Sequence, residues 1–117
     1  MNTVIVPVDF SPTSMHAAEY AAQLLVGHYG TVLTLYHSYD DEMEKEEAQE
    51  KMDVLKADLM SKNIVKIETL LHAESNFVEG LETAARHKQA DLIVMGFSGK
   101  SAVEQVLFGS NTLKMAE

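Results

Sequence analysis

Short apolar runs alternate along the chain with longer segments whose apolar residues recur at helical spacing, and this alternation constrains the fold most. Each run is short, apolar and rich in β-branched residues or leucine, as expected of a buried strand. The runs cover Thr3–Val8, Thr31–His37, Ile64–Leu71 and Asp91–Met95. Strands that alternate with helices imply βαβ units with right-handed crossovers, so the sequence predicts an α/β fold with a parallel sheet covered on both faces.

The segments after the first and fourth runs carry signals for helices. Ser11 is a good N-cap and Pro12 a good first helical residue, so a helix is expected to start there. Beyond the fourth run, Ser101–Phe108 is predicted to form a short helix. Gly109 and Ser110 are then expected to open a last helix that runs to the end of the chain.

The acidity of the chain is concentrated where the second helix is predicted to begin. The formal net charge is −9, and Asp40–Glu50 alone carries seven acids and one lysine, a charge of −6. Apolar residues follow at helical steps from Ala48 to Leu59, so the acids are interpreted as one solvated helix face. An isoelectric point near 4.9 argues against nucleic-acid binding through a broad basic surface.

Length and composition place the chain among small soluble domains. Its 117 residues fit one domain, since domains usually hold roughly 100–200 residues. It has no cysteine, which excludes disulfides and thiolate metal sites. No apolar run reaches the roughly 18 residues of a membrane span, and the N-terminus lacks the features of a signal peptide. We therefore expect a single cytoplasmic domain, residues 1–117, that does not bind membranes.

Two loops are the first places to expect a ligand. Open α/β sheets bind ligands beyond the carboxyl ends of their strands, at the point where the strand order reverses. The loops that follow the first and fourth strands are Asp9–Ser11 and Gly96–Lys100. Asp9 is more readily explained as a ligand contact at this position than as an acid that only starts a loop.

The glycines after the fourth strand suit an anion site but match no standard phosphate motif. A Walker A loop needs a glycine five positions before Gly99, where this chain has Val94. No Rossmann glycine triplet follows the first strand. Glycine turns expose amide N–H groups, and a helix start at Gly109-Ser110 attracts phosphate, with Lys100 adding a positive charge. The alternative is a plain turn followed by a helix cap, and the residues alone leave both interpretations open.

Histidines and serines give no sign of a metal or catalytic site. No pair of histidines has metal-ligand spacing, and no HExxH motif occurs, so no protein-held metal is expected. His37 alone ends a strand near the inferred site. No GxSxG motif surrounds Ser11 or Ser14, and no general base or paired acids accompany the glycine loop, so no catalytic residue is assigned.

The sequence resembles the universal stress protein family over its whole length. The opening Val4–Ser14 (VIVPVDFSPTS) resembles the first strand and loop of that family, and Ala90–Gly96 (ADLIVMG) resembles its fourth strand. The ATP-binding class of the family carries the pattern G-x2-G-x9-G-[ST]. Gly96, Gly99 and Gly109-Ser110 match that pattern, including its nine-residue gap.

The resemblance implies a Rossmann-like, adenine nucleotide alpha hydrolase-like sheet in the order 3-2-1-4, followed in the family by a fifth strand. It also implies a site for ATP across the carboxyl ends of strands one and four. The positions implied for the adenosine are Pro7, Val8, Asp9, Ser38, Met95 and Gly96, and those for the phosphates are Ser98, Gly99, Lys100, Gly109, Ser110, Asn111 and Thr112. Magnesium would be held mainly by phosphate and water oxygens.

The chain departs from the family at its C-terminal end. It stops at Met115-Ala116-Glu117, without the V-P-V-L-V-type fifth strand that pairs two protomers in many relatives. We therefore expect the fourth strand to be an unpaired edge that can recruit another chain. A homo-oligomer, a dimer, is still expected, and its mode of association is left open.

Two functions follow from the resemblance, and an enzymatic one is less favoured. The first is a stress-response or signalling domain that binds ATP, changes its affinity for a partner and hydrolyses ATP slowly at most. The second is an interaction or dimerisation module of the same fold that binds no nucleotide. An adenylating enzyme of the ATP-pyrophosphatase group is discounted, since Asp9–Ser14 does not match the S-G-G-x-D-S loop of that group.

Overall fold

Four parallel strands and one antiparallel strand form a single sheet in the order β3-β2-β1-β4-β5. The computed structural model describes residues 3–28, 30–63, 65–74, 76–96 and 105–108. The parallel order 3-2-1-4 and the α/β class are those expected from the sequence. The elements are β1 (Thr3–Pro7), α1 (Pro12–Leu24), β2 (Val32–Tyr39), α2 (Glu42–Lys62), β3 (Lys66–Ala73), α3 (Phe77–His87), β4 (Leu92–Met95) and β5 (Gln105–Phe108).

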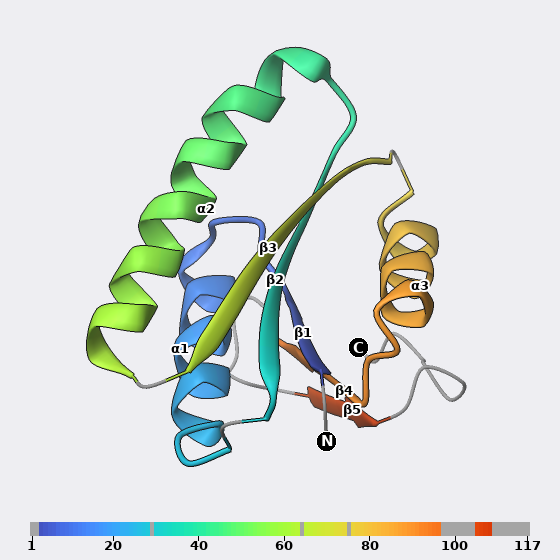
Figure 1. The fold of residues 1–117 in the computed structure, drawn as a ribbon. Helices are drawn as coiled ribbons and strands as arrows, with labels where there is room; N and C mark the ends of the chain where they lie inside the picture. Colours follow the sequence, from blue (N-terminus) through green and yellow to red (C-terminus); the bar gives the residue numbers. More distant parts are fainter. Residues whose placement is uncertain (1–2, 29, 64, 75, 97–104, 109–117) are drawn as a thin grey trace.

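Helices cover both faces of the sheet, with α1 and α2 on one face and α3 on the other (Figure 1). The alternation of side chains along β1 divides the core accordingly. Val4 and Val6 pack toward Met52 and its neighbours on the face of α1 and α2, whereas Ile5 packs with Leu81 under α3. In the part of the chain that the structure describes, no helix has both the length and the apolar character needed to cross a membrane.

The three helices begin at polar caps. The Ser11 side chain accepts a hydrogen bond from the backbone N–H of Ser14, which confirms the predicted cap and places Pro12 at the first helical position. Asp41 caps α2 by accepting from the N–H of Met43, and Asn76 caps α3 in the same way. Each cap satisfies a backbone donor that has no partner within the first helical turn.

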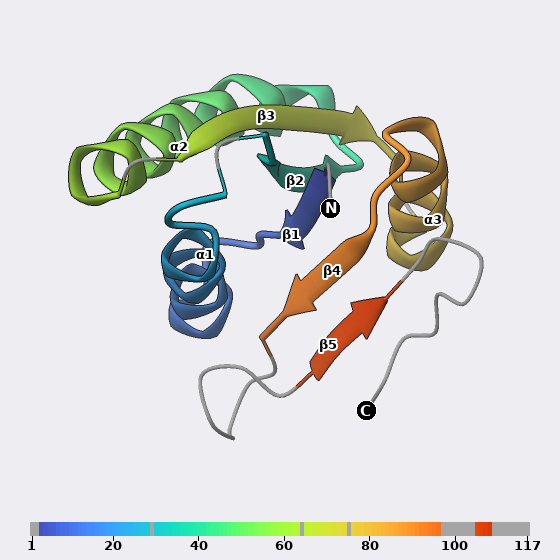
Figure 2. The same cartoon turned by 60° about the horizontal axis from the view of Figure 1, so that its bottom comes forward.

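The prediction of a helix at Ser101–Phe108 is wrong for its last four residues. Gln105–Phe108 is the strand β5, which pairs antiparallel with β4 in a register that joins Leu92 to Phe108 (Figure 2). A short apolar segment fits either a helix or a strand, and the open edge of β4 supplies hydrogen-bonding partners that only a strand can use. The expectation that β4 is an unpaired edge is therefore also wrong, because β5 fills the fifth position. The helix predicted from Gly109 lies outside the described residues.

Gly80 of α3 lies against the hydroxyl end of Tyr36 on β2. A Cβ atom at position 80 would come within 2.5 Å of the Tyr36 Oη and 2.8 Å of Glu74 Cγ. The Tyr36 side chain is fully buried, and its hydroxyl has no hydrogen-bond partner among the described residues. Burial raises the pKa of Tyr36, and the nearby charge of Glu74 adds to the rise. Because a Cβ atom at position 80 would collide with the buried Tyr36 side chain, the close approach of α3 to the sheet requires glycine there.

Gly80→Ala is predicted to lower the free energy of unfolding by about 1–2 kcal/mol, because the steric conflict outweighs the gain in helix propensity. Urea unfolding measures the change, with Thr83→Ala on the exposed face of the same helix as control. Adding Tyr36→Phe to Gly80→Ala removes the hydroxyl that the new methyl group meets and should restore part of the loss. A Gly80→Ala variant as stable as the wild type would contradict this account of the contact.

Candidate functional site

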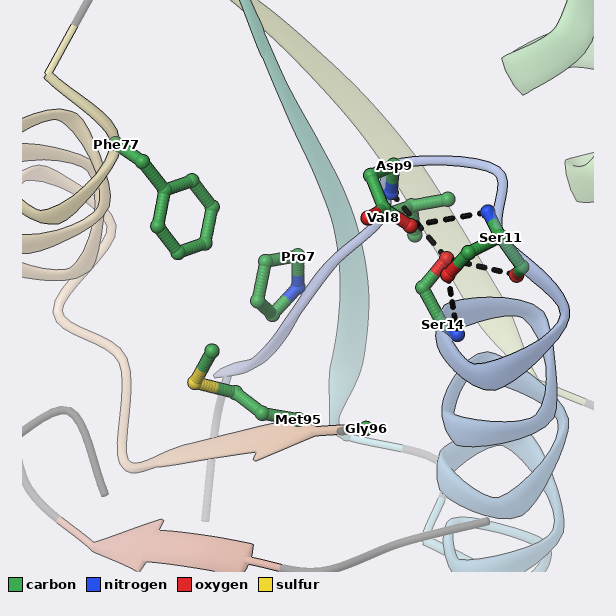
Figure 3. Close-up of a pocket in the computed structure, with 8 residues that line it drawn as sticks. All are labelled: Pro7, Val8, Asp9, Ser11, Ser14, Phe77, Met95 and Gly96. Carbon is green, nitrogen blue, oxygen red and sulfur yellow. Dashed lines mark hydrogen bonds between the residues drawn. The ribbon is translucent and has the colours of Figure 1, made fainter. Parts of the chain in front are cut away.

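A pocket of about 260 Å³ opens at the carboxyl ends of β1 and β4 (Figure 3). The ring of Phe77 reaches from α3 toward Pro7 and Met95 on one side, and Asp9 lies with the first residues of α1 on the other. This volume is slightly below the range of about 300–1,000 Å³ that is typical of small-molecule sites. The lining residues are Pro7, Val8, Asp9, Ser11, Ser14, Phe77, Met95 and Gly96.

The topology of the sheet places the pocket at this point. After β1 the chain turns into α1 on one face, whereas β4 is reached from α3 on the opposite face (Figure 1). Because these connections diverge, a crevice forms beyond the neighbouring ends of β1 and β4. The N-terminal ends of α1 and α3 border this crevice and contribute Ser14 and Phe77.

Asp9 is an exposed carboxylate held in place by the turn into α1. Its Oδ1 accepts a hydrogen bond of 2.9 Å from the N–H of Ser11, and its own N–H donates to the Oγ of Ser14 at 3.2 Å. Partial burial by itself would raise the pKa of Asp9. Hydrogen bonds from Ser11 and Ser14 outweigh this effect and leave the pKa below its ordinary value of 3.8. The group is therefore negatively charged at neutral pH and can accept hydrogen bonds from a ligand.

Phe10 follows Asp9 in an uncommon backbone conformation with a φ of 66°. A bulky residue rarely adopts a positive φ, and the conformation persists only where the surroundings fix it. Here the Phe10 ring lies 4.8 Å from that of His37, between ring centroids, and the Nζ of Lys51 lies 5.4 Å from the Phe10 centroid. These contacts hold the ring in a hollow against α2, on a different part of the surface from the pocket.

Five of the residues predicted for the site come together in this pocket. They are Pro7, Val8, Asp9, Met95 and Gly96. Ser38 lies on β2, in register with His72 of β3, and does not line the pocket. The remaining predicted positions, Ser98, Gly99, Lys100, Gly109, Ser110, Asn111 and Thr112, lie outside the described residues, so their role stays a prediction.

The sequence interpretation missed two residues of the pocket wall, Ser14 and Phe77. Ser11 lies in the loop where a ligand was expected, although its own role was predicted only as a helix cap, and it lines the pocket together with Ser14. Phe77 was not singled out at all. A usable signal existed, because Phe77 precedes Leu81 and Ala84 by four and seven positions and so continues the buried stripe of α3 by one turn. The ring of Phe77, in the first turn of α3, lines the pocket.

Among the residues that the structure describes, no group of three or more His, Asp or Glu side chains is placed to hold a metal ion. The donor set of the pocket consists of one carboxylate, two hydroxyls and backbone groups. Such a set suits hydrogen bonding to a polar organic ligand between apolar walls.

Sheet order and pocket together define an open α/β domain with a candidate ligand site at its topological switch point. The model of the universal stress protein family matches residues 1–117, the whole chain. Universal stress protein MJ0531 of Methanocaldococcus jannaschii is 31% identical over 122 residues, which cover 92% of this chain and 71% of that protein. The chain therefore belongs to the universal stress protein family.

Solved structures agree with this assignment. A protein of the universal stress protein family from Burkholderia pseudomallei has a TM-score of 0.69 and 28% identity, with 82% of this chain and 81% of that chain covered. A universal stress protein crystallised in complex with cAMP has a TM-score of 0.68 and 21% identity, with coverages of 79% and 69%. The second likeness extends to the fold alone.

The lowered pKa of Asp9 predicts a pH-dependent contribution to stability. Because the folded-state pKa lies below the unfolded value of 3.8, the contribution is fully present above that value and is lost as the pH falls through the folded-state pKa. Wild type should therefore be more stable than Asp9→Asn at about pH 6, and the difference should shrink toward about pH 3. Urea unfolding of both proteins across this range measures it, and a difference independent of pH would contradict the assignment.

Proposed function

We propose that this protein binds an adenine nucleotide, ATP with Mg²⁺, in the pocket between β1 and β4. The observation that carries the proposal is the convergence of Pro7, Val8, Asp9, Met95 and Gly96, from two distant parts of the sequence, into one pocket at the topological switch point. Membership of the universal stress protein family supports it. The nucleotide would control the affinity of the protein for a partner in a stress response or in signalling.

The chemistry of the pocket fits the adenosine part of the nucleotide. Phe77, Pro7 and Met95 supply an apolar wall of the kind that packs against a nucleobase. Asp9 is charged at neutral pH, so it accepts hydrogen bonds from ribose hydroxyls or an amino group and repels phosphate. This electrostatic preference orients the nucleotide with its adenosine at Asp9 and its phosphates beyond Gly96.

The phosphates would meet the segment whose glycine spacing matches the ATP-binding class. Gly96, Gly99 and Gly109-Ser110 supply the pattern, and Lys100 supplies one positive charge. Backbone N–H groups at such turns bind anions without a dedicated basic cluster. Magnesium would be coordinated by phosphate and water oxygens. We assign no catalytic residue, and hydrolysis would be slow at most.

The titration must also establish which adenine nucleotide the protein prefers. A universal stress protein of the same fold was crystallised with cAMP, so cAMP and ATP both belong in the titration. Isothermal titration calorimetry of the folded protein with Mg-ATP, Mg-ADP and cAMP measures affinity and preference. Absence of heat with all three nucleotides at high micromolar protein would contradict the proposal.

A nucleotide-independent interaction module is the second candidate. The observation that favours it is the place of β5 at the end of the sheet order, since an edge strand offers backbone hydrogen bonds to another chain. We propose a cytoplasmic homo-oligomer in either case. Sedimentation velocity with and without Mg-ATP separates the candidates, because a module of the second kind associates equally in both conditions.

Gly99→Val and Gly109→Val are predicted to abolish ATP binding, because a side chain at either position blocks the approach of the backbone to the phosphates. Gly30→Val is the matched control, since a Cβ atom at position 30 meets nothing within 4 Å. Calorimetry on all three variants, after circular dichroism has shown that each is folded, measures the effect. Unchanged affinity in both loop variants would contradict the assignment of the phosphate site.

Phe77→Ala is predicted to weaken ATP binding by about tenfold, the usual order for loss of an aromatic side chain that stacks on a base. Val78→Ala is a close control, because Phe77 and Val78 are 40% and 38% exposed and only Phe77 lines the pocket. Equal affinities in the two variants would place the adenine elsewhere.

A further inference from the structure

The peptide unit between Val8 and Asp9 is held from both sides by side chains of other elements. Its carbonyl oxygen, on Val8, lies 2.7 Å from Nδ1 of His37 on β2. Its N–H, on Asp9, donates to Oγ of Ser14 on α1 at 3.2 Å. The preceding N–H of Val8 donates to the carbonyl of Tyr36 at 2.7 Å. Backbone oxygen atoms only accept hydrogen bonds, so Nδ1 of His37 must carry the proton and donate it to Val8.

The orientation of this peptide sets the direction of the Asp9 side chain. Asp9 begins where the clamped peptide ends, and its carboxylate is fixed at the other end by the N–H of Ser11. Rotation of the Val8–Asp9 peptide would therefore break two hydrogen bonds and move the carboxylate relative to Phe77 and Met95 across the pocket. A group that meets a ligand must be held to a fraction of an ångström by its supporting contacts.

His37 itself faces away from the pocket. It lies in the hollow against α2, where the other lining residues are Phe10, Glu44, Glu47, Ala48 and Lys51. Its ring packs against that of Phe10 in a tilted arrangement, with an interplanar angle of 42°. Lys51 is paired with Glu47 at 3.1 Å within the same hollow. Any influence of His37 on a ligand in the pocket must therefore pass through the backbone of Val8.

We propose that His37 is a positioning residue, which together with Ser14 fixes the Val8–Asp9 peptide and thereby determines the affinity of the pocket for the hydroxyl or amino groups that Asp9 binds. This inference rests on the proposed function, since the ligand is the adenine nucleotide. A histidine outside the pocket, His37, thus orients the Asp9 carboxylate that lies within the pocket. Phe10 supports the ring of His37 from its strained backbone conformation.

A double-mutant cycle on Mg-ATP affinity tests the inference. His37→Phe keeps an aromatic ring against Phe10 and removes the donor to Val8, whereas His37→Asn keeps an N–H donor near the position of Nδ1 and removes the ring. Each substitution is combined with Asp9→Asn, and calorimetry gives four dissociation constants for each cycle. Circular dichroism and urea unfolding establish that each variant is folded.

His37→Phe should weaken binding about tenfold in the wild-type background, the order expected when a buried acceptor loses its partner, and less than about threefold in the Asp9→Asn background. His37→Asn should stay within about threefold of wild type. A loss of equal size in both backgrounds would overturn the inference while leaving nucleotide binding intact. Absence of binding by the wild-type protein would instead overturn the proposed function, and the inference with it.

A second measurement needs no variant and so covers the case in which His37→Phe does not fold. The ring ¹⁵N shifts of His37 in the wild-type protein at about pH 8 report which nitrogen is protonated in the neutral ring. The inference requires the proton on Nδ1, the less common tautomer of free histidine. A neutral ring protonated on Nε2 would leave no donor for Val8 and would overturn the inference.

Discussion

β1 is buried on both faces and pairs with β2 on one side and β4 on the other. Its side chains therefore pack into two separate cores, one under α1 and α2 and one under α3. The chain leaves β1 for α1 on one face of the sheet and reaches β4 from α3 on the other face. A crevice therefore forms beyond the carboxyl ends of β1 and β4. Every described residue of the candidate site is placed by this arrangement, either at the end of a central strand or at the start of a helix that borders it.

The loop after β1 carries the polar groups of the candidate site. Pro7 ends the strand, and the next four residues must turn into α1 while they keep their polar backbone groups paired. The side chains of Asp9, Ser14 and His37 supply these partners, to the N–H of Ser11, the N–H of Asp9 and the carbonyl of Val8 respectively. The strained conformation of Phe10 and the lowered pKa of Asp9 are both products of the same tight turn. Local backbone strain of this kind is commonly retained where it holds a functional group in place.

The parallel sheet, its helices and the cap at Ser11 could be predicted from periodicity and helix-start residues, because those signals are local. Asp9 and Gly96 could be placed together because topology dictates where strand ends meet, whereas Pro7, Val8 and Met95 were implied by the family resemblance. β5 could not be predicted, since the four residues Gln105–Phe108 are too few to show a period that separates strand from helix. The contact of His37 with Val8 depends on side-chain orientation across the sheet, and the approach of Gly80 to Tyr36 depends on the distance between two layers. Neither contact can be predicted from the spacing of residues along the sequence.

The proposed ligand of the pocket at the ends of β1 and β4 is an adenine nucleotide. Mapping ¹H–¹⁵N chemical-shift changes on addition of Mg-ATP tests it most directly. Among the described residues, the largest changes are expected at Val8, Asp9, Ser14, Phe77 and Gly96. Small changes are expected at Glu50 and Val54, which line a different hollow, between Met15 and Leu55, away from the pocket. Changes concentrated at Val54 and Glu50, or none anywhere at saturating nucleotide, would contradict it.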